Sequence, residues 1–371
     1  MMLARFSNCA SERSHAMTQT LSPPPMMRPM MRTALLYGQL DVRISQRPRP
    51  QLERPDEVLI DVAYTGICGS ELHAIEGYEL VKSSGAPTAR EPSALGHEYA
   101  GVVRAIGPEV QHLRVGQRVT VAPRGPCHQC ELCRNGASAI CRKVTQRGGS
   151  WAEQIVAPAK LVHALPDDVP LTIGALTEPL SAAVRIIDRA ELLGGMNVCV
   201  IGAGPIGLFA AVLAKHGGAA KVIISDPRPS RRALAKRMGI PLVIDPKQTD
   251  LYSVVMDHTN GRGVEVSIEA VGLEPALSDS LKVVSVGGMV VWGGLAPTDV
   301  IVPLSPNDMF MREYTLRTSW GGIELFERTI RLEQKIDWSP MVEEIFSLDQ
   351  AHAAVQYART EAAGKVLLNC Q

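Results

Sequence analysis

Short apolar runs separated by glycine and proline mark the first part of the chain, from residue 32 onward. Clear examples are residues 33–37, 57–64, 99–107 and 117–121. Runs of this length with turn residues between them are typical of strands in an all-β, barrel-like domain. We predict such a domain over residues 32–180.

The pattern changes near Leu180, where apolar runs begin to alternate with helical stretches. The strands predicted in this part are residues 197–201, 221–225, 264–270 and 288–294. Such alternation predicts a parallel sheet with helices on both faces, an α/β doubly wound domain. We place this domain at residues 181–312. The tail, residues 313–371, carries an amphipathic helix at 349–358 and is expected to return to the first domain.

One apolar stretch is long enough to suggest a membrane span. Met196–Ala214 has 19 residues, and Asn197 is its single polar side chain. Three glycines and a proline lie in its middle, where a strand must turn into a helix. We therefore interpret it as a buried strand and helix, with no membrane partner.

Residues 1–31 differ from the rest of the chain. They hold seven of the fourteen methionines and four prolines, and they show no hydrophobic period. We expect this extension to be disordered, because it has little to bury. Two alternatives stay open: a transit peptide, or translation from a start codon upstream of a true start near Met31.

Composition narrows the function further. The chain has 371 residues, enough for two domains, and its formal net charge is zero. This balance and the 4% aromatic content give no support for a nucleic-acid partner. Eight cysteines are present, but four are clustered and the rest form no disulfide framework. We read them as reduced, which favours an intracellular, cytoplasmic protein.

Four cysteines stand in the spacing C-x2-C-x2-C-x7-C. Four thiolates this close in sequence can fill all four positions around one tetrahedral Zn²⁺. A filled coordination sphere leaves no room for substrate, so we predict a structural zinc site over residues 127–141. Its ligands are Cys127, Cys130, Cys133 and Cys141.

A glycine-rich turn follows the strand at 197–201. Its G-x-G-x-x-G spacing, between a strand and a helix, indicates a dinucleotide-binding site. Asp226 ends the next strand and favours NAD over NADP, although the arginines that follow it weaken this preference and NADP stays open. The alternative for Asp226 is a helix N-cap. The candidate cofactor-binding residues are Gly202, Gly204, Pro205, Ile206, Gly207, Asp226 and Arg231.

A second set of candidate metal ligands has mixed chemistry: Cys68, His97, Glu98 and Glu178. Sulfur, nitrogen and oxygen donors suit a catalytic zinc that keeps one coordination position open. Neighbouring His97 and Glu98 cannot both point the same way on a regular strand. Either the chain bends there, or Glu98 contacts the metal ligands without binding the metal itself.

These motifs together resemble the zinc-dependent medium-chain dehydrogenases/reductases, nearest to the polyol (sorbitol/xylitol) dehydrogenase branch, with L-threonine dehydrogenase as a relative. The carriers are G-I-C-G-S-E-L-H, G-H-E, the four-cysteine lobe, T-E-P-L and G-A-G-P-I-G, in this order. The resemblance covers residue 32 to the C-terminus. It implies a GroES-like β-barrel catalytic domain plus a Rossmann domain, with the active site between them, and a homodimer or homotetramer.

The resemblance also implies roles for single residues. Cys68, His97 and Glu98 would bind the catalytic zinc, and Glu178 would bind it directly or through water. Ser70 would hydrogen-bond the substrate hydroxyl, and His73 would extend a proton path to solvent. Zinc would lower the pKa of a bound alcohol, and a hydride would then pass to the nicotinamide.

Three positions depart from the family pattern. Glu71 replaces the usual aspartate, Ala74 stands where sorbitol dehydrogenases often have an aromatic residue, and Arg185 stands where a histidine is common. Arg185 could bind an anionic or heavily hydroxylated substrate, or could only cap a helix or face solvent.

The function predicted from the sequence is hydride transfer between NAD and a secondary alcohol of a polyol, sugar or cyclitol, with two zinc ions per chain. An amino-alcohol substrate such as L-threonine is the alternative within the enzyme class. A nucleotide-binding protein that kept the fold and lost the chemistry is the alternative outside it.

Overall fold

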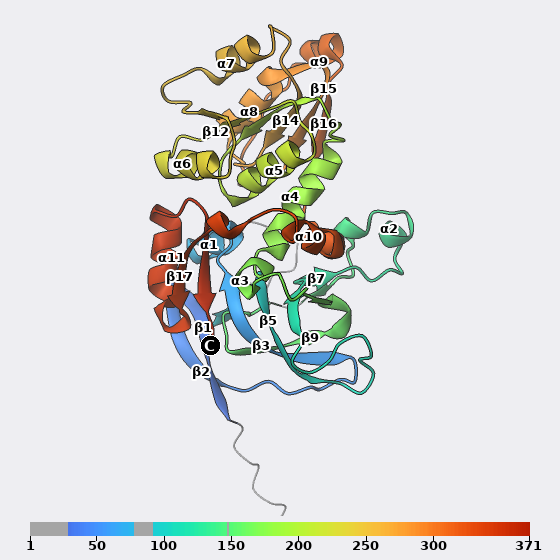
Figure 1. Ribbon diagram of the computed structural model, residues 1–371, viewed down its shortest axis with the longest axis vertical. Helices are drawn as coiled ribbons and strands as arrows, with labels where there is room; N and C mark the ends of the chain where they lie inside the picture. The colour runs from blue at the N-terminus through green and yellow to red at the C-terminus, as the bar shows by residue number, and fades with distance from the viewer. Residues whose placement is uncertain (1–28, 78–91, 147) are drawn as a thin grey trace, which may run out of the picture.

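The predicted β domain is the lower part of the computed structural model, which describes residues 29–77, 92–146 and 148–371 (Figure 1). Within these ranges its largest sheet has the strand order β10-β6-β5-β3-β18-β17, with β9 also paired to β3. The strands are β3 (Glu57–Gly66), β5 (Tyr99–Ile106), β6 (Arg118–Val121), β9 (Gln154–Pro158), β10 (Val162–Ala164), β17 (Val342–Ser347) and β18 (Lys365–Asn369).

Alternation along the central strand β3 explains this domain's core. Val58, Ile60 and Val62 are buried on one face, as expected when successive side chains point to opposite sides of a sheet. The tail contributes β17 and β18 to the same sheet, and β18 lies antiparallel to β3.

Smaller elements complete the β domain. In one further sheet β1 pairs with both β2 and β4, and in another β7 pairs with β8. Their bounds are β1 (Met30–Gly38), β2 (Asp41–Pro48), β4 (Ser93–Ala94), β7 (Arg124–Gly125) and β8 (Thr145–Gln146). The helices are α1 (Gly69–Ile75), α2 (Glu131–Arg134), α3 (Leu171–Gly174), α10 (Phe326–Glu333) and α11 (Ala351–Thr360).

The predicted N-terminal extension falls mostly on residues 1–28, which lie outside the described residues. Its last two residues, Met30 and Met31, already belong to β1, where they pair with β2.

The upper domain in Figure 1 is the predicted parallel sheet. Among the described residues its strand order is β13-β12-β11-β14-β15-β16, and every neighbouring pair is parallel. The strands are β11 (Asn197–Ile201), β12 (Lys221–Ser225), β13 (Leu242–Ile244), β14 (Val264–Glu269), β15 (Val284–Trp292) and β16 (Thr315–Thr318). The sheet thus extends to Thr318, past the predicted boundary at residue 312.

Helices cover this sheet: α5 (Pro205–His216), α6 (Pro229–Arg237), α7 (Leu251–His258), α8 (Glu274–Val283) and α9 (Pro306–Arg312). Both the β domain and the doubly wound α/β domain predicted from the sequence are therefore confirmed. The apolar stretch Met196–Ala214 is β11 followed by α5, as predicted. No helix in the described part of the chain is long and apolar enough to cross a membrane.

A long helix, α4 (Thr177–Arg189), joins the two domains and is visible between them in Figure 1. Its buried face, with Leu180 and Val184, belongs to one apolar core that also includes Val200 of the upper sheet. Phe209 of α5 contacts Trp338 of the tail edge-on, with ring centroids 5.2 Å apart. This shared core fixes the position of one domain against the other and so defines the cleft between them.

Candidate active site and metal centres

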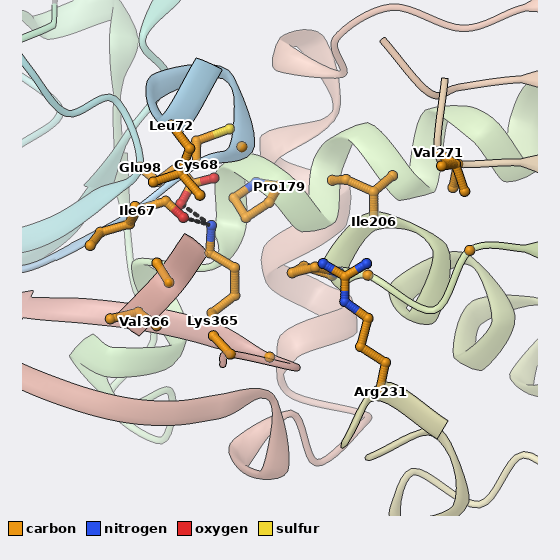
Figure 2. Close-up of a pocket in the computed structure, with 18 residues that line it drawn as sticks. Ile67, Cys68, Leu72, Glu98, Pro179, Ile206, Arg231, Val271, Lys365 and Val366 are labelled. Carbon is orange, nitrogen blue, oxygen red and sulfur yellow. Dashed lines mark hydrogen bonds and ion pairs between the residues drawn. The ribbon is translucent and has the colours of Figure 1, made fainter. Parts of the chain in front are cut away.

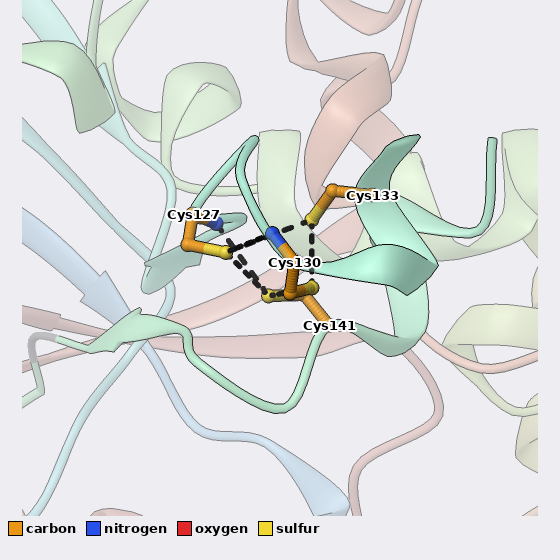
Figure 3. A group of neighbouring side chains, drawn as sticks. All are labelled: Cys127, Cys130, Cys133 and Cys141. Carbon is orange, nitrogen blue, oxygen red and sulfur yellow. Dashed lines mark hydrogen bonds between the residues drawn. The ribbon is translucent and has the colours of Figure 1, made fainter. Parts of the chain in front are cut away.

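The four lobe cysteines gather around one point, as Figure 3 shows. Neighbouring sulfur atoms lie 3.5 Å apart for Cys130–Cys133, 3.6 Å for Cys127–Cys141, 3.7 Å for Cys130–Cys141 and 3.9 Å for Cys127–Cys133. Zinc–sulfur bonds of about 2.3 Å at tetrahedral angles require sulfur atoms about 3.8 Å apart. The four sulfurs therefore fit one closed zinc site.

Local backbone geometry favours negative sulfur in this lobe. The N–H groups of Gln129 and Cys130 point at Cys127 Sγ, at 3.5 and 3.3 Å. These N–H groups lower the pKa of Cys127 to about 6. A thiolate is the form that binds metal, and these two N–H groups favour it at Cys127.

The second group of donors joins two distant segments of the β domain. Cys68 is the N-cap residue of α1, and His97 and Glu98 lie just before β5. One donor atom from each residue lies within 4.8 Å of the other two. His97 and Glu98 are not in a strand, and Gly96 before them has φ +100°. The chain therefore bends there, which lets both side chains face Cys68.

A third carboxylate positions these donors. Glu71 Oε1 lies 2.9 Å from His97 Nδ1, and Glu71 also accepts the N–H groups of Cys68 and Gly96, at 3.0 and 2.7 Å. The Nδ1–H of His97 donates to the carboxylate, so Nε2 remains as the ligand atom. Burial opposes a charge on His97, but Glu71 and Cys68 raise its pKa well above the usual value. Glu71 was noted in the sequence only as a departure from the family pattern.

Glu98 is buried, and one of its carboxylate oxygens pairs with a lysine while the other faces no hydrogen-bond donor among the described residues. Its Oε2 lies 2.5 Å from Lys365 Nζ, and the same Nζ donates to the carbonyl oxygen of Ile67 at 2.8 Å (Figure 2). Its other oxygen, Oε1, is buried and has no hydrogen-bond partner among the residues that the structure describes. A buried carboxylate oxygen without a donor is expensive unless a cation contacts it. The donor set and this orphaned oxygen both fit a metal ion bound with Cys68 and His97.

The remaining predicted residues line the same cavity from other directions. Ser70 and His73 lie on α1, and Glu178 lies in the first turn of α4. Glu178 is not part of the tight group of three donors. Burial raises the pKa of its carboxyl group, against the opposing charges of His97 and other cations. Ser70 Oγ donates to Cys68 Sγ at 3.3 Å.

The glycine-rich turn lies on the opposite wall of the cleft. Gly202 has φ +98°, and a Cβ added to Gly207 would lie 1.9 Å from Gly202 O, so neither position tolerates a side chain. Pro205 and Ile206 open α5 and line the cavity with these glycines. Free N–H groups at this helix start suit a pyrophosphate.

Asp226 is buried directly below this turn. Its Oδ2 accepts the N–H of Ala203 at 2.9 Å, and its Oδ1 accepts the N–H of Arg228 at 2.8 Å. Arg231 Nη1 lies 3.5 Å from the same Oδ2, and the guanidinium reaches the Gly204 side of the cavity (Figure 2). A carboxylate has about four acceptor positions, so capacity remains for a ligand hydroxyl. The N-cap of α6 is Arg228, not Asp226.

Arg185 does not reach the cavity lining. It forms an ion pair with Glu324. Of the two roles left open for it, substrate binding has no support from this geometry. Another cation, Arg124, does line the cavity, together with Trp320.

Three contributors were therefore missed in the sequence: Lys365, Arg124 and Trp320. A lysine at the start of an otherwise apolar strand, K-V-L-L-N, was a signal for Lys365. Nothing in the sequence pattern marked Arg124 or Trp320.

Comparison with known proteins agrees with this architecture. Residues 54–167 match the alcohol dehydrogenase GroES-like domain, and residues 205–338 match the zinc-binding dehydrogenase domain. The chain is similar to D-xylulose reductase A of Aspergillus niger, at 34% identity over 73% of this chain and 77% of that protein.

Solved structures are similar over almost the whole chain. A protein described as a zinc-binding dehydrogenase, from Sinorhizobium meliloti 1021 and bound to NADP, has a TM-score of 0.85 and 28% identity over 92% of this chain and 100% of its own. Galactitol-1-phosphate dehydrogenase from Escherichia coli has a TM-score of 0.82 and 27% identity over 91% of this chain and 100% of its own.

Proposed function

Because the chain belongs to the zinc-dependent medium-chain alcohol dehydrogenases, we propose that it moves a hydride between NAD and a secondary alcohol of a polyol, sugar or cyclitol. One observation carries the proposal. The donor atoms of Cys68, His97 and Glu98 line the same cavity as Ile206 at the start of α5, so an alcohol held at the donors would face a nicotinamide bound at the turn.

Cys68, His97 and Glu98 would hold the catalytic zinc, and Glu178 would join them directly or through water. Bound zinc supplies a Lewis acid that makes the substrate hydroxyl more acidic, and bound NAD supplies the hydride acceptor. Glu71 keeps His97 oriented for this task, and Lys365 neutralises part of the negative charge that the ligands bring together.

The chain's own groups would carry the proton. Ser70 Oγ lies at the cavity wall and now donates to Cys68 Sγ. We propose that it accepts the proton of the substrate hydroxyl and that His73, one helical turn further along α1, extends the path to solvent.

Asp226 would bind the ribose hydroxyls of the cofactor, which supports NAD as the preferred form. Arg231 would lie beside the phosphates, since its guanidinium reaches the glycine turn. NADP stays open, because the same guanidinium could accept a 2′-phosphate.

The test is reduction of NAD or NADP, followed at 340 nm, against a panel of pentitols, hexitols, cyclitols, simple secondary alcohols and L-threonine. Turnover of hydroxylated compounds above L-threonine and the simple alcohols supports the proposal. Turnover of L-threonine alone would favour the amino-alcohol alternative. Metal analysis separates the non-catalytic alternative, since the two donor groups predict two zinc ions per chain.

Assembly and compartment are further parts of this proposal. Ile301 and Phe310 are highly exposed near the edge strand β16, at 82% and 78%, which supports a homodimer or homotetramer. Light scattering on the purified protein tests this. The cysteines described in the structure are all free thiols, which supports a reducing compartment such as the cytoplasm.

A further inference from the structure

Arg124 is a half-buried cation on the cavity wall, and its guanidinium forms no ion pair with any residue that the structure describes. It lies at the start of β7 and lines the same cavity as Cys68, His97 and Glu178. Within the described residues, no carboxylate oxygen lies within 4.0 Å of its nitrogens. Glu178 and Glu324 act on it only from a distance, and Glu324 is already paired with Arg185.

The guanidinium is nonetheless held in place. It stacks on the ring of Trp320, with 4.1 Å between Arg124 Cζ and the ring centroid. Its Nη2 lies against Gly321, where an added Cβ would be 2.7 Å away. A cation on an aromatic face next to a glycine keeps a fixed orientation, so its donors are available to a ligand.

The electrostatics are unusual for a purely structural arginine. Burial lowers the pKa of Arg124, while Glu178 and Glu324 raise it from a distance. A desolvated cation without a counter-ion is unfavourable by itself, and an anion that enters the cavity removes this penalty.

We infer that the substrate carries a carboxylate, bound by Arg124 and Trp320 at one end of the cavity while its secondary alcohol lies at Cys68, His97 and Glu98. This inference rests on the proposed function and deepens it: the substrate class is a polyhydroxylated acid. The planar guanidinium matches a carboxylate with two parallel hydrogen bonds. Arg231 and Lys365 line the part of the cavity beside the glycine turn. In the part that Trp320 lines, Arg124 is the single lysine or arginine among the described residues, which suits a monoanion better than a phosphate dianion.

The first experiment compares matched substrates. A pentitol, the pentonate of the same configuration and the pentitol phosphate are each assayed with the zinc-loaded protein and NAD or NADP. We expect kcat/KM to be at least about tenfold higher for the pentonate than for the pentitol, as for one charged hydrogen-bonded contact. A preference for the pentitol, or for the phosphate over the pentonate, would overturn the inference.

Variants then assign the effect to the residue. Arg124→Met should lower kcat/KM for the pentonate about 100-fold, mainly through KM, and should lower kcat/KM for the pentitol by a much smaller factor. Arg124→Lys keeps the charge but loses the two parallel N–H donors of the guanidinium, so its kcat/KM for the pentonate should lie between those of the unchanged protein and Arg124→Met. It replaces Arg124→Met as the test if the methionine variant does not fold. The matched control is Arg328→Met, because Arg328 is an exposed arginine paired with Asp188 outside the cavity.

Equal losses on pentonate and pentitol in both Arg124 variants would show a structural role and overturn the inference. A second readout does not depend on turnover. Binding of the pentonate to the zinc-loaded protein without cofactor, followed by calorimetry, should weaken about tenfold or more in Arg124→Met. If no alcohol is turned over, the proposed function fails; if neutral polyols are turned over as well as acids, only this inference fails.

Discussion

Lys365 Nζ lies 2.5 Å from Oε2 of Glu98, one of the three candidate metal ligands of the active site, and both side chains are almost fully buried. Burial opposes the charge on Lys365, but Glu98 and Cys68 raise its pKa, so the lysine stays protonated. The ammonium group of Lys365 thus faces the Glu98 carboxyl group directly. Lys365 thus offsets part of the negative charge that the ligands would bring together at the metal site.

Replacing Lys365 by methionine should therefore destabilise the protein, because it leaves the Glu98 carboxylate buried and without a partner. We expect the free energy of unfolding of the metal-stripped protein to fall by about 3 kcal/mol, measured by urea unfolding. Zinc should restore part of this loss by pairing with the same carboxylate. The control is Lys282→Met, which breaks an exposed pair with Asp279 and should change stability by less than about 1 kcal/mol. Equal effects of the two substitutions would contradict our account of the buried pair.

Glu71 should control metal affinity without binding metal itself. Its carboxylate holds His97 Nδ1 at 2.9 Å and the N–H of Cys68 at 3.0 Å. We expect Glu71→Gln to weaken binding of the catalytic zinc about 10- to 100-fold, measured by competition with a chelator. Glu71→Asp, the usual residue of the family, should recover most of the affinity. Unchanged zinc affinity in Glu71→Gln would mean that His97 is oriented by other contacts.

Distance along the chain explains what could be predicted from the sequence. The four lobe cysteines and the glycine turn act within short segments, so their spacing alone indicates the geometry. Glu98 and Lys365 are separated by 267 residues, and their contact depends on β18 pairing with β3. Arg124 meets Trp320 only because the loop after β16 packs against β7, which no local pattern predicts. The predicted domain boundary at residue 312 lies before β16 for a similar reason, because β16 belongs to the upper sheet only through its pairing with β15.

The two metal centres should respond differently to loss of a cysteine. Cys68→Ser removes a ligand from the open site and should abolish turnover, leaving about one zinc ion per chain and a nearly unchanged Tm. Cys130→Ser removes a ligand from the closed site and should lower the Tm, because the free energy of zinc binding at a structural site stabilises the folded protein. Zinc analysis by mass spectrometry and thermal unfolding measure both effects. If Cys68→Ser lowered the Tm and Cys130→Ser did not, the assignment of the two sites would be reversed.

Asp226 should decide the choice of cofactor. Asp226→Ala removes the acceptor for ribose hydroxyls and also frees Arg231, which now lies 3.5 Å from the carboxylate. We expect KM for NAD to rise about tenfold relative to KM for NADP. In the double variant Asp226→Ala with Arg231→Met, any improvement of KM for NADP seen in Asp226→Ala should disappear. If the NAD/NADP ratio does not move in the single variant, Asp226 only supports the glycine turn through its contacts with Ala203 and Arg228.

Glu333 on α10 should make stability depend on pH. Burial raises the pKa of its carboxyl group from 4.5 to about 8, although the Thr177 hydroxyl donates to it at 2.8 Å. Between these two values the unfolded chain has lost the proton and the folded chain retains it, so the free energy of unfolding falls as pH rises. The loss is complete once the pH passes about 8, and it amounts to at most roughly 5 kcal/mol.

Glu333→Gln should flatten this slope, because the amide keeps the shape of the acid and does not titrate. The readout is the slope of unfolding free energy between about pH 5 and pH 8, measured by urea unfolding. Absolute stability is a poorer readout, since the buried Oε2 of Glu333 has no hydrogen-bond partner in the described part of the chain, and an amide N–H₂ there would have none either. The exposed Glu109→Gln provides the matched control and should leave the slope unchanged. A slope that survives in Glu333→Gln would assign the pH dependence to another buried group.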